Sequence, residues 1–403
     1  MPKAPDTAAR RLAAQQIARP AFKTPAELVA YLGAVQAQDY AACKWAVGLR
    51  LAGAPGEASV ERTIDDGEVL RIHALRGTWQ LVAPADAHWM LELVAPRLIA
   101  GAATRHRQLG LDAATFRRSR AALAKALRGG AQLTRTELAS ALEGAGISTA
   151  GQRLAHLLQR AELDALICGA ARRGKQFTYA LLDDRAPDSR ARLDRGEALA
   201  ELARRYFRSR GPATVDDFKW WSGLAPADAR SGLDAVQSRL ASTTLDGRTY
   251  WFDDDAARKT RSSKAFLLPA FDEYLIAYRD RGVVLEPQHV KRLNAGGGML
   301  GPCVVLDGRA IGTWKRTLGR ETVAIEIDLF EAPARGASHV LEDAARRYGD
   351  FLGLEARLFG SACMERTDTS RSCPSRASPT TVATRRPGLG RSCTTGTIQE
   401  PRL

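Results

Sequence analysis

The chain has 403 residues, of which 45% are hydrophobic and 26% are charged, a usage typical of globular proteins rather than of disordered or fibrous chains. Its 59 lysine and arginine residues outnumber the 45 acidic residues, and the net charge of +14 favours a polyanionic partner, with nucleic acid as the first candidate. No apolar run reaches the roughly 18 residues of a transmembrane helix, and the polar N-terminus lacks a signal-peptide pattern. We therefore expect a cytoplasmic protein, without a membrane partner, built from about two to four packed units.

The cysteines and the common enzyme motifs give no sign of a metal site. The six cysteines form no C-x-x-C pair, and none lies beside a histidine at metal-ligand spacing. The sequence also lacks the G-x-S-x-G, H-E-x-x-H and G-x-x-x-x-G-K-S/T motifs. We expect neither a metal centre nor a disulfide framework.

One pattern of helix starts recurs three times. A threonine precedes an acidic residue by three positions in a capping-box arrangement, at Thr24 with Glu27, Thr134 with Glu137 and Thr214 with Asp217. Each box is expected to begin a helix, with a leading helix before it and a second amphipathic helix after it. The leading helices are predicted at 8–18, 113–128 and 194–209, and the second helices at 59–66, 152–165 and 227–240.

A strand pair follows each group of helices. The pairs are 70–75 with 77–82, 165–169 with 176–181 across the loop 170–175, and 240–245 with 248–252 across an Asp-Gly turn. Three helices and a hairpin are the order of a winged helix, so we predict an α+β fold with three tandem winged-helix units. Three unrelated helix-and-hairpin segments in a mixed fold are the alternative on pattern alone.

The part of the chain after residue 262 has a different pattern. A hairpin is predicted over 302–316 around Asp307-Gly308, then the alternating strand 322–329 and a helix at about 337–353. These elements predict a small C-terminal β domain closed by a helix. The predicted units are residues 1–100 (the first winged helix with a linking helix at 84–100), 101–190, 191–260, 261–360 and a tail, 361–403.

The tail differs abruptly in composition. Residues 361–403 are rich in Ser, Thr, Pro and Arg and contain no aromatic residue, so they cannot bury enough apolar surface to offset the entropy of ordering. We predict that this segment is disordered, or non-native through a frameshift. It contains seven arginines and three acidic residues, so +10 of the net charge remains on residues 1–360.

Gln36-Ala37-Gln38 is an unusual polar segment after the helix that begins at Thr24. Pattern alone favours a helix end and a loop, with the two amides capping backbone groups. No hydrolase motif surrounds it that would assign it a reaction.

Several dispersed blocks resemble those of one family. The blocks are Val35–Tyr40 with Lys44 and Trp45, Leu75–Asp86, Leu133–Leu138, Gly211–Trp221, Phe271–Arg281 and Leu306–Trp314. They resemble the bacterial winged-helix proteins that include the AlkZ-like DNA glycosylases, over about residues 8–355. The resemblance implies a monomeric enzyme at the nucleoid that acts on double-stranded DNA carrying alkylated bases or interstrand crosslinks, without a metal or an organic cofactor.

The resemblance also implies site residues. In that family a motif of glutamine, apolar residue and glutamine carries catalysis, which assigns this role to Gln36 and Gln38. We expect Asp39 to cap a helix, with a contribution to the local field as the alternative. After the Gly-Thr-Trp block the family pattern has histidine, whereas this sequence has Gln80. His73 is the nearest local substitute, although by itself it is typical of a satisfied histidine in a wing strand.

These residue types suit the implied reaction. A purine alkylated at N7 or N3 is already cationic, so its glycosidic bond breaks without a strong general acid. What remains is to stabilise an oxocarbenium-like sugar and to position a water, which two carbonyl dipoles can do once the lesion is presented to them. The basic residues expected to contact phosphates are Arg172, Arg173, Lys175, Arg279, Arg281, Lys315 and Arg316.

Two alternatives lie outside enzyme chemistry. A winged-helix transcription regulator would read bases with a recognition helix, but the helix predicted at 59–66 is acidic and offers little to a major groove. A nonenzymatic lesion-binding protein is the second alternative, and the departure at Gln80 favours it.

Overall fold

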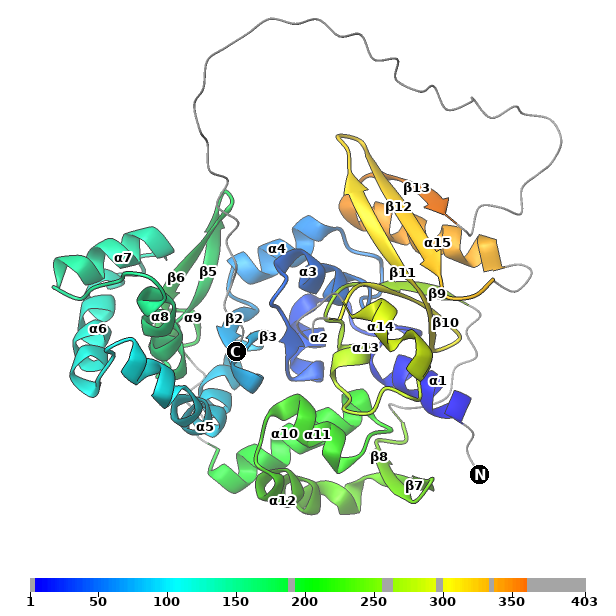
Figure 1. Ribbon diagram of the computed structural model, residues 1–403, viewed down its shortest axis with the longest axis horizontal. Helices are drawn as coiled ribbons and strands as arrows, with labels where there is room; N and C mark the ends of the chain where they lie inside the picture. The colour runs from blue at the N-terminus through cyan, green and yellow to red at the C-terminus, as the bar shows by residue number, and fades with distance from the viewer. Residues whose placement is uncertain (1–3, 188–192, 256–263, 295–299, 333–336, 361–403) are drawn as a thin grey trace, which may run out of the picture.

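The computed structural model describes residues 4–187, 193–255, 264–294, 300–332 and 337–360. The chain folds as a mixture of helices and strands (Figure 1). The segment 361–403, which we predicted to be disordered or non-native, lies outside the described residues. Within them, we find no helix with both the length and the apolar character needed to cross a membrane.

Residues 4–82 contain helix α1 and the first of three repeats. The elements are α1 (Ala4–Ala14), α2 (Pro25–Leu32), β1 (Val35–Gln36), α3 (Tyr40–Gly48), α4 (Glu57–Asp65), β2 (Leu70–His73) and β3 (Trp79–Val82). The predicted capping box at Thr24 is confirmed, because the Thr24 hydroxyl accepts the Glu27 N–H and the Glu27 carboxylate accepts the Thr24 N–H. The strands form an antiparallel sheet in the order β1-β3-β2.

The second repeat, residues 109–185, follows the linking helix α5 (Ala87–Gln108). Its elements are α6 (Ala113–Ala126), β4 (Leu133–Thr134), α7 (Arg135–Gly144), α8 (Arg153–Leu163), β5 (Ile167–Arg173), β6 (Gln176–Leu181) and α9 (Leu182–Arg185). The sheet order is β4-β6-β5, and the capping box at Thr134 is confirmed. The loop predicted over 170–175 is wrong: Arg172 and Arg173 belong to β5, because the pairing with β6 continues to Gln176.

The third repeat, residues 195–252, contains α10 (Arg195–Arg210), α11 (Val215–Ser222), α12 (Pro226–Val236), β7 (Ala241–Leu245) and β8 (Arg248–Phe252). The predicted Asp-Gly hairpin is confirmed, with positive φ at both turn residues, Asp246 (48°) and Gly247 (73°). A single bridge between Ala213 and Trp251 replaces the short third strand of the other two sheets. All three repeats therefore share the order helix, short strand or bridge, helix, helix, hairpin.

This shared order corrects the predicted alignment of the first repeat. The loop expected after Gln38 is helix α3, so α2 rather than the predicted leading helix at 8–18 corresponds to α6. Residues 42–48 of α3 are all buried, so α3 lacks the alternation of polar and apolar faces by which amphipathic helices are predicted.

Residues 265–360 form the C-terminal sheet and its covering helix. The elements are β9 (Ala265–Leu268), α13 (Glu273–Ile276), α14 (Val290–Leu293), β10 (Cys303–Leu306), β11 (Arg309–Leu318), β12 (Thr322–Leu329), α15 (Ala337–Leu352) and β13 (Glu355–Gly360). The sheet order is β13-β12-β11-β10-β9, and the hairpin, alternating strand and closing helix are confirmed. Strand β13, parallel to β12, was not predicted, because none of its side chains is fully buried and the apolar signal is weak.

The apolar core joins segments that are far apart in sequence. Trp45 of α3 packs against Tyr348 and Phe351 of α15, with ring centroids 5.1 and 5.0 Å apart, and its indole N–H donates to the Leu267 carbonyl. A second cluster joins the first hairpin to the third repeat, and a third consists of residues from the second repeat. The first repeat accordingly lies between the second repeat and the C-terminal sheet (Figure 1). The boundaries of the predicted units remain a prediction.

Asp217 joins the third repeat to the C-terminal segment. Its Oδ2 accepts the N–H and the hydroxyl of Thr214 in the confirmed capping box of α11. Its Oδ1 accepts the backbone N–H groups of Arg279 and Asp280 at 2.9 and 3.3 Å. Asp217 is only 1% exposed. If its carboxylate were removed, water would have little access to these N–H groups and could not replace it as their acceptor.

Removing this carboxylate is expected to be costly. Asp217→Ala should lower the free energy of unfolding by about 3 kcal/mol or more, because it removes a cap and leaves buried N–H groups unsatisfied. Glu137→Ala removes the equivalent carboxylate of the second capping box, where Glu137 itself is exposed, and should cost about 1 kcal/mol. Urea unfolding followed by tryptophan fluorescence measures both losses, and equal losses would contradict the anchoring role of Asp217.

Candidate active site

The two glutamines of the Gln36-Ala37-Gln38 segment lie in different environments. Gln36 is 8% exposed and belongs to β1, where its Oε1 accepts the Ala37 N–H at 3.0 Å and its Nε2 donates to Thr78 Oγ1 at 3.3 Å. Gln38 is exposed, and no hydrogen bond joins its amide to any residue in the described part of the chain. One amide is thus held inside the protein and the other faces solvent.

Gln80, at the position where the resemblance led us to expect histidine, faces Gln36. The two residues are opposite each other on β1 and β3, and the Gln80 Nε2 lies 3.4 Å from the Gln36 Oε1. Neighbouring residues on a strand point to opposite faces of the sheet, and His73 is paired with Trp79. His73 therefore lies on the other face.

His73 is occupied by contacts of its own. Its ring packs against Trp79 with centroids 3.9 Å apart and the two planes tilted by 40°, and its Nδ1 and backbone N–H both contact Glu162 Oε2, at 3.0 and 2.9 Å. This agrees with the expectation of a satisfied wing-strand histidine. His73 therefore does not lie beside Gln36, where the resemblance led us to expect a histidine.

Asp39 begins the next helix. Its Oδ1 accepts the Ala42 N–H at 2.9 Å, so it is the N-cap of α3, as expected. Between the glutamines, the Ala37 carbonyl accepts two hydrogen bonds from the Arg71 guanidinium, at 3.2 and 3.1 Å. That guanidinium lies 3.9 Å from the Trp79 ring centroid and 4.7 Å from that of Phe177. Burial lowers the pKa of Arg71 from its ordinary value, a cost that these contacts offset.

A buried ion pair holds the backbone of β1. The Glu273 Oε1 accepts the Gln36 N–H at 3.0 Å, while its Oε2 accepts two N–H groups of Arg210 at 2.9 and 2.7 Å and the Trp221 indole N–H at 3.0 Å. Arg210 also donates to the carbonyls of two residues just before β1, at 2.6 and 2.7 Å. Glu273 and Arg210 are 1% and 0% exposed.

These supporting residues were not predicted from the sequence. Thr78 and Glu273 lie in blocks that carry the family resemblance, but nothing in the local pattern assigns either to Gln36. Thr78 is brought to Gln36 by the pairing of β3 with β1, a short strand that was not predicted from the sequence. Glu273 is 237 positions from Gln36 and is brought to it only by the tertiary fold.

The predicted phosphate-contacting residues lie in three separate places. In the hairpin of the second repeat, Arg172 pairs with Glu61 at 3.2 Å, Arg173 pairs with Glu137 at 2.7 Å, and Lys175 is exposed in the turn. On β11, Lys315 and Arg316 line a cavity of about 120 Å³ together with Asp39, the residue that follows Gln38 in sequence. Arg316 also donates to the Tyr348 hydroxyl.

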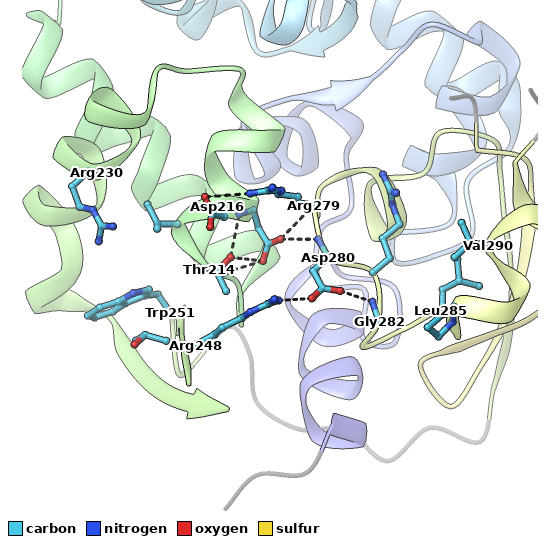
Figure 2. A pocket seen from close by; sticks show the side chains of 15 residues that line it. Thr214, Asp216, Arg230, Arg248, Trp251, Arg279, Asp280, Gly282, Leu285 and Val290 are labelled. Carbon is cyan, nitrogen blue, oxygen red and sulfur yellow. Dashed lines mark hydrogen bonds and ion pairs between the residues drawn. The ribbon is translucent and has the colours of Figure 1, made fainter. Parts of the chain in front are cut away.

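The third place is a cavity of about 740 Å³ (Figure 2). Side chains from α11, α12 and β8 line one side of it, and the segment 279–290 lines the other (Figure 2). Arg279 and Arg281 lie here with Arg230 and Arg248, two arginines that were not predicted from the sequence to contact phosphates. Arg248 pairs with Asp280 at 2.5 Å, and burial lowers the pKa of Arg281. The cavity is rich in arginine, and its carboxylates partly offset the positive charge.

One group of side chains has the composition of a metal site. Glu286, His289 and Glu331 place one potential ligand atom each within 4.8 Å of one another. Glu286 is already paired with Arg309 at 2.8 Å, and the group lies before α14 and after β12 rather than on β1.

Comparison with known proteins identifies the family of this chain. The family described as DNA glycosylase AlkZ-like matches residues 29–351, a range that includes both glutamines. The interstrand DNA cross-link repair glycosylase of Streptomyces sahachiroi is 27% identical over 321 residues, which are 72% of this chain and 81% of that protein. The solved structure of Streptomyces sahachiroi DNA glycosylase AlkZ has a TM-score of 0.75 at 23% identity, over 88% of this chain and 98% of that chain, which shows a shared fold. This chain therefore belongs to the AlkZ-like DNA glycosylase family, whose members hydrolyse N-glycosyl bonds.

Proposed function

We propose that this protein is a monofunctional DNA glycosylase that releases cationic alkylated purines from double-stranded DNA. Gln36 and Gln38 position the hydrolytic water and face the positive charge that develops on the sugar. The observation that carries this proposal is the pair of amides at β1, one buried in a defined hydrogen-bond network and one exposed. No metal or organic cofactor is required by this chemistry.

Neutral amides suit a substrate that already carries its charge. When the bond between N9 and C1′ breaks, the alkylated purine takes the bonding electrons and leaves as a neutral base. Water then adds to C1′ and loses a proton to solvent, which leaves an abasic site. Glutamine is no base at neutral pH, but its carbonyl dipole orients the water and lowers the energy of the adjacent cationic sugar.

The two glutamines have different tasks in this proposal. Gln38 is exposed and can contact the DNA directly. The Gln36 Oε1 accepts the Ala37 N–H at 3.0 Å but the Gln80 amide only at 3.4 Å. The longer contact is the weaker one, so a water can replace it when bound DNA excludes bulk solvent.

We also propose that each of the three repeats is a winged helix and that the protein binds DNA as a monomer. The repeated element order and the matching sheet orders β1-β3-β2 and β4-β6-β5 support this assignment. The exposed cations of the second hairpin, of the 279–281 segment and of β11 are proposed to contact phosphates. A substrate of chromosomal DNA would place the protein at the nucleoid.

Crosslinked purines are proposed as part of the substrate range. The related Streptomyces sahachiroi protein is an interstrand DNA cross-link repair glycosylase. A purine joined through N7 to a crosslinking agent carries the same positive charge as a methylated one. The same pair of amides therefore serves both kinds of lesion in this proposal.

Removal of both amides tests the proposed site. The variant Gln36→Ala/Gln38→Ala should release N7-methylguanine from methylated DNA at least about a hundredfold more slowly under single-turnover conditions, because the water and the sugar cation lose their oriented dipoles. Abasic sites scored on a gel measure the rate. The control variant Gln108→Ala/Gln288→Ala removes two exposed amides that lie outside β1, and it should release N7-methylguanine at the wild-type rate. An unchanged rate in the first variant would make the mechanism wrong, and binding without release by the wild type would indicate a lesion-binding protein.

The phosphate contacts are tested by salt dependence. Lys175→Ala and Arg279→Ala should each reduce the slope of log affinity against log salt concentration by about one, because each removes one released counterion. Fluorescence anisotropy with duplex DNA at several salt concentrations measures this slope. Arg346→Ala, which removes an exposed arginine of α15, is the control and should leave the slope unchanged. Equal slopes in all four proteins would contradict the proposed surface.

A further inference from the structure

Thr78 stands at the end of a tight turn that is anchored to the third repeat. The turn contains two consecutive residues with positive φ, Arg76 at 58° and Gly77 at 70°. The Arg76 side chain leaves the turn and donates to the Trp221 carbonyl at 2.7 Å. The Thr78 backbone closes the turn, since its carbonyl accepts the Ala74 N–H at 3.1 Å. The position of the Thr78 side chain is therefore set by the turn and by its docking on α11.

The hydroxyl of Thr78 has only one proton, and that proton is already used. Thr78 Oγ1 donates to the Leu75 carbonyl at 3.1 Å. Toward other groups the oxygen can therefore only accept. Two amides face it, Gln80 Nε2 at 2.9 Å and Gln36 Nε2 at 3.3 Å. Both glutamines must turn their NH₂ groups toward Thr78.

This one acceptor decides where the carbonyl of Gln36 points. With its NH₂ group on Thr78, the Gln36 amide directs Oε1 away from the turn, where it accepts the Ala37 N–H and the Gln80 amide. A flipped amide would place a carbonyl oxygen against the hydroxyl oxygen of Thr78, and neither atom could donate. Gln80 is held by the same hydroxyl, so Thr78, Gln36 and Gln80 form a polar triangle with one consistent orientation.

We propose that Thr78 is a positioning residue for the reaction: by accepting from both amides, it keeps the Gln36 carbonyl directed toward the hydrolytic water. This inference rests on the proposed catalytic role of Gln36. Thr78 does not contact the substrate in this scheme and acts only through Gln36 and Gln80. Its loss should slow the chemical step and leave DNA binding unchanged.

Two substitutions separate the hydroxyl from the shape of the side chain. Thr78→Val keeps the volume and the branched shape but removes the acceptor, so the Gln36 amide can rotate. Release of N7-methylguanine at saturating DNA should slow by about tenfold, the scale of one lost hydrogen bond. Thr78→Ser restores the hydroxyl and should return the rate to within about twofold of the wild type. Single-turnover rates and DNA dissociation constants are measured for each variant.

Thr63→Val is the matched control. Thr63 also donates its hydroxyl to a backbone carbonyl in the first repeat, that of Ser59 at 3.1 Å, but it lies on α4 and touches neither glutamine. This variant should keep the wild-type rate, and thermal unfolding of all three variants shows whether each is folded at the assay temperature.

The outcomes separate this inference from the proposed function. An unaltered rate in Thr78→Val, with the double glutamine variant inactive, would overturn the positioning role alone. Equal slowing in Thr78→Val and Thr78→Ser, or weaker DNA binding that accounts for the slower release, would also overturn it. If the double glutamine variant keeps its rate, the proposed function fails first. A slow Thr78→Val, a restored Thr78→Ser and an unchanged dissociation constant would support the positioning role.

Discussion

The buried pair of Arg210 and Glu273 is the interaction on which the arrangement of the site depends. Burial of two charges costs free energy, and the cost is offset only where all of their hydrogen-bonding groups find partners. Here the carboxylate accepts from β1, from Arg210 itself and from Trp221, and the guanidinium binds the carbonyls that lead into β1. Loss of either partner would leave an uncompensated buried charge. The pair thus ties the strand of Gln36 to the third repeat and to the segment after β9.

Around this anchor the site is built from neutral amides and a hydroxyl. Thr78, Gln36 and Gln80 can satisfy one another without any change of protonation, so their arrangement does not depend on pH near neutrality. The pKa of a carboxylate in the same place would be raised by desolvation and lowered by a cationic lesion. Its charge at neutral pH would therefore depend on the balance of the two effects. Positive charge lies around these neutral groups, on Arg71 at the Ala37 carbonyl, on Arg210 of the buried pair and on the exposed cations of the hairpins and loops.

The elements predicted correctly from the sequence are those with strong local signals. The three capping boxes, the Asp-Gly turns of two hairpins and the amphipathic helix α15 each depend on residues within a few positions of one another. The elements that were predicted wrongly or not at all lack such local signals. Helix α3 is buried along residues 42–48 and has no amphipathic pattern, and β13 lacks buried residues. The loop predicted at Arg172 and Arg173 is strand, because pairing across the sheet overrides the local preference for a longer turn.

The sequence by itself determined the three capping-box helices, the hairpin that follows each of them and the excess of positive charge, and through the family resemblance it led to the proposal of Gln36 and Gln38. It could not determine which histidine or glutamine shares a face with Gln36, because that depends on the register between β1, β2 and β3. Only the tertiary structure brought Glu273 to the Gln36 N–H and set Gln80, rather than His73, beside its carbonyl. The physical reason is that a hydrogen bond requires about 3 Å between two atoms, a condition that residues far apart in sequence meet only in the folded chain.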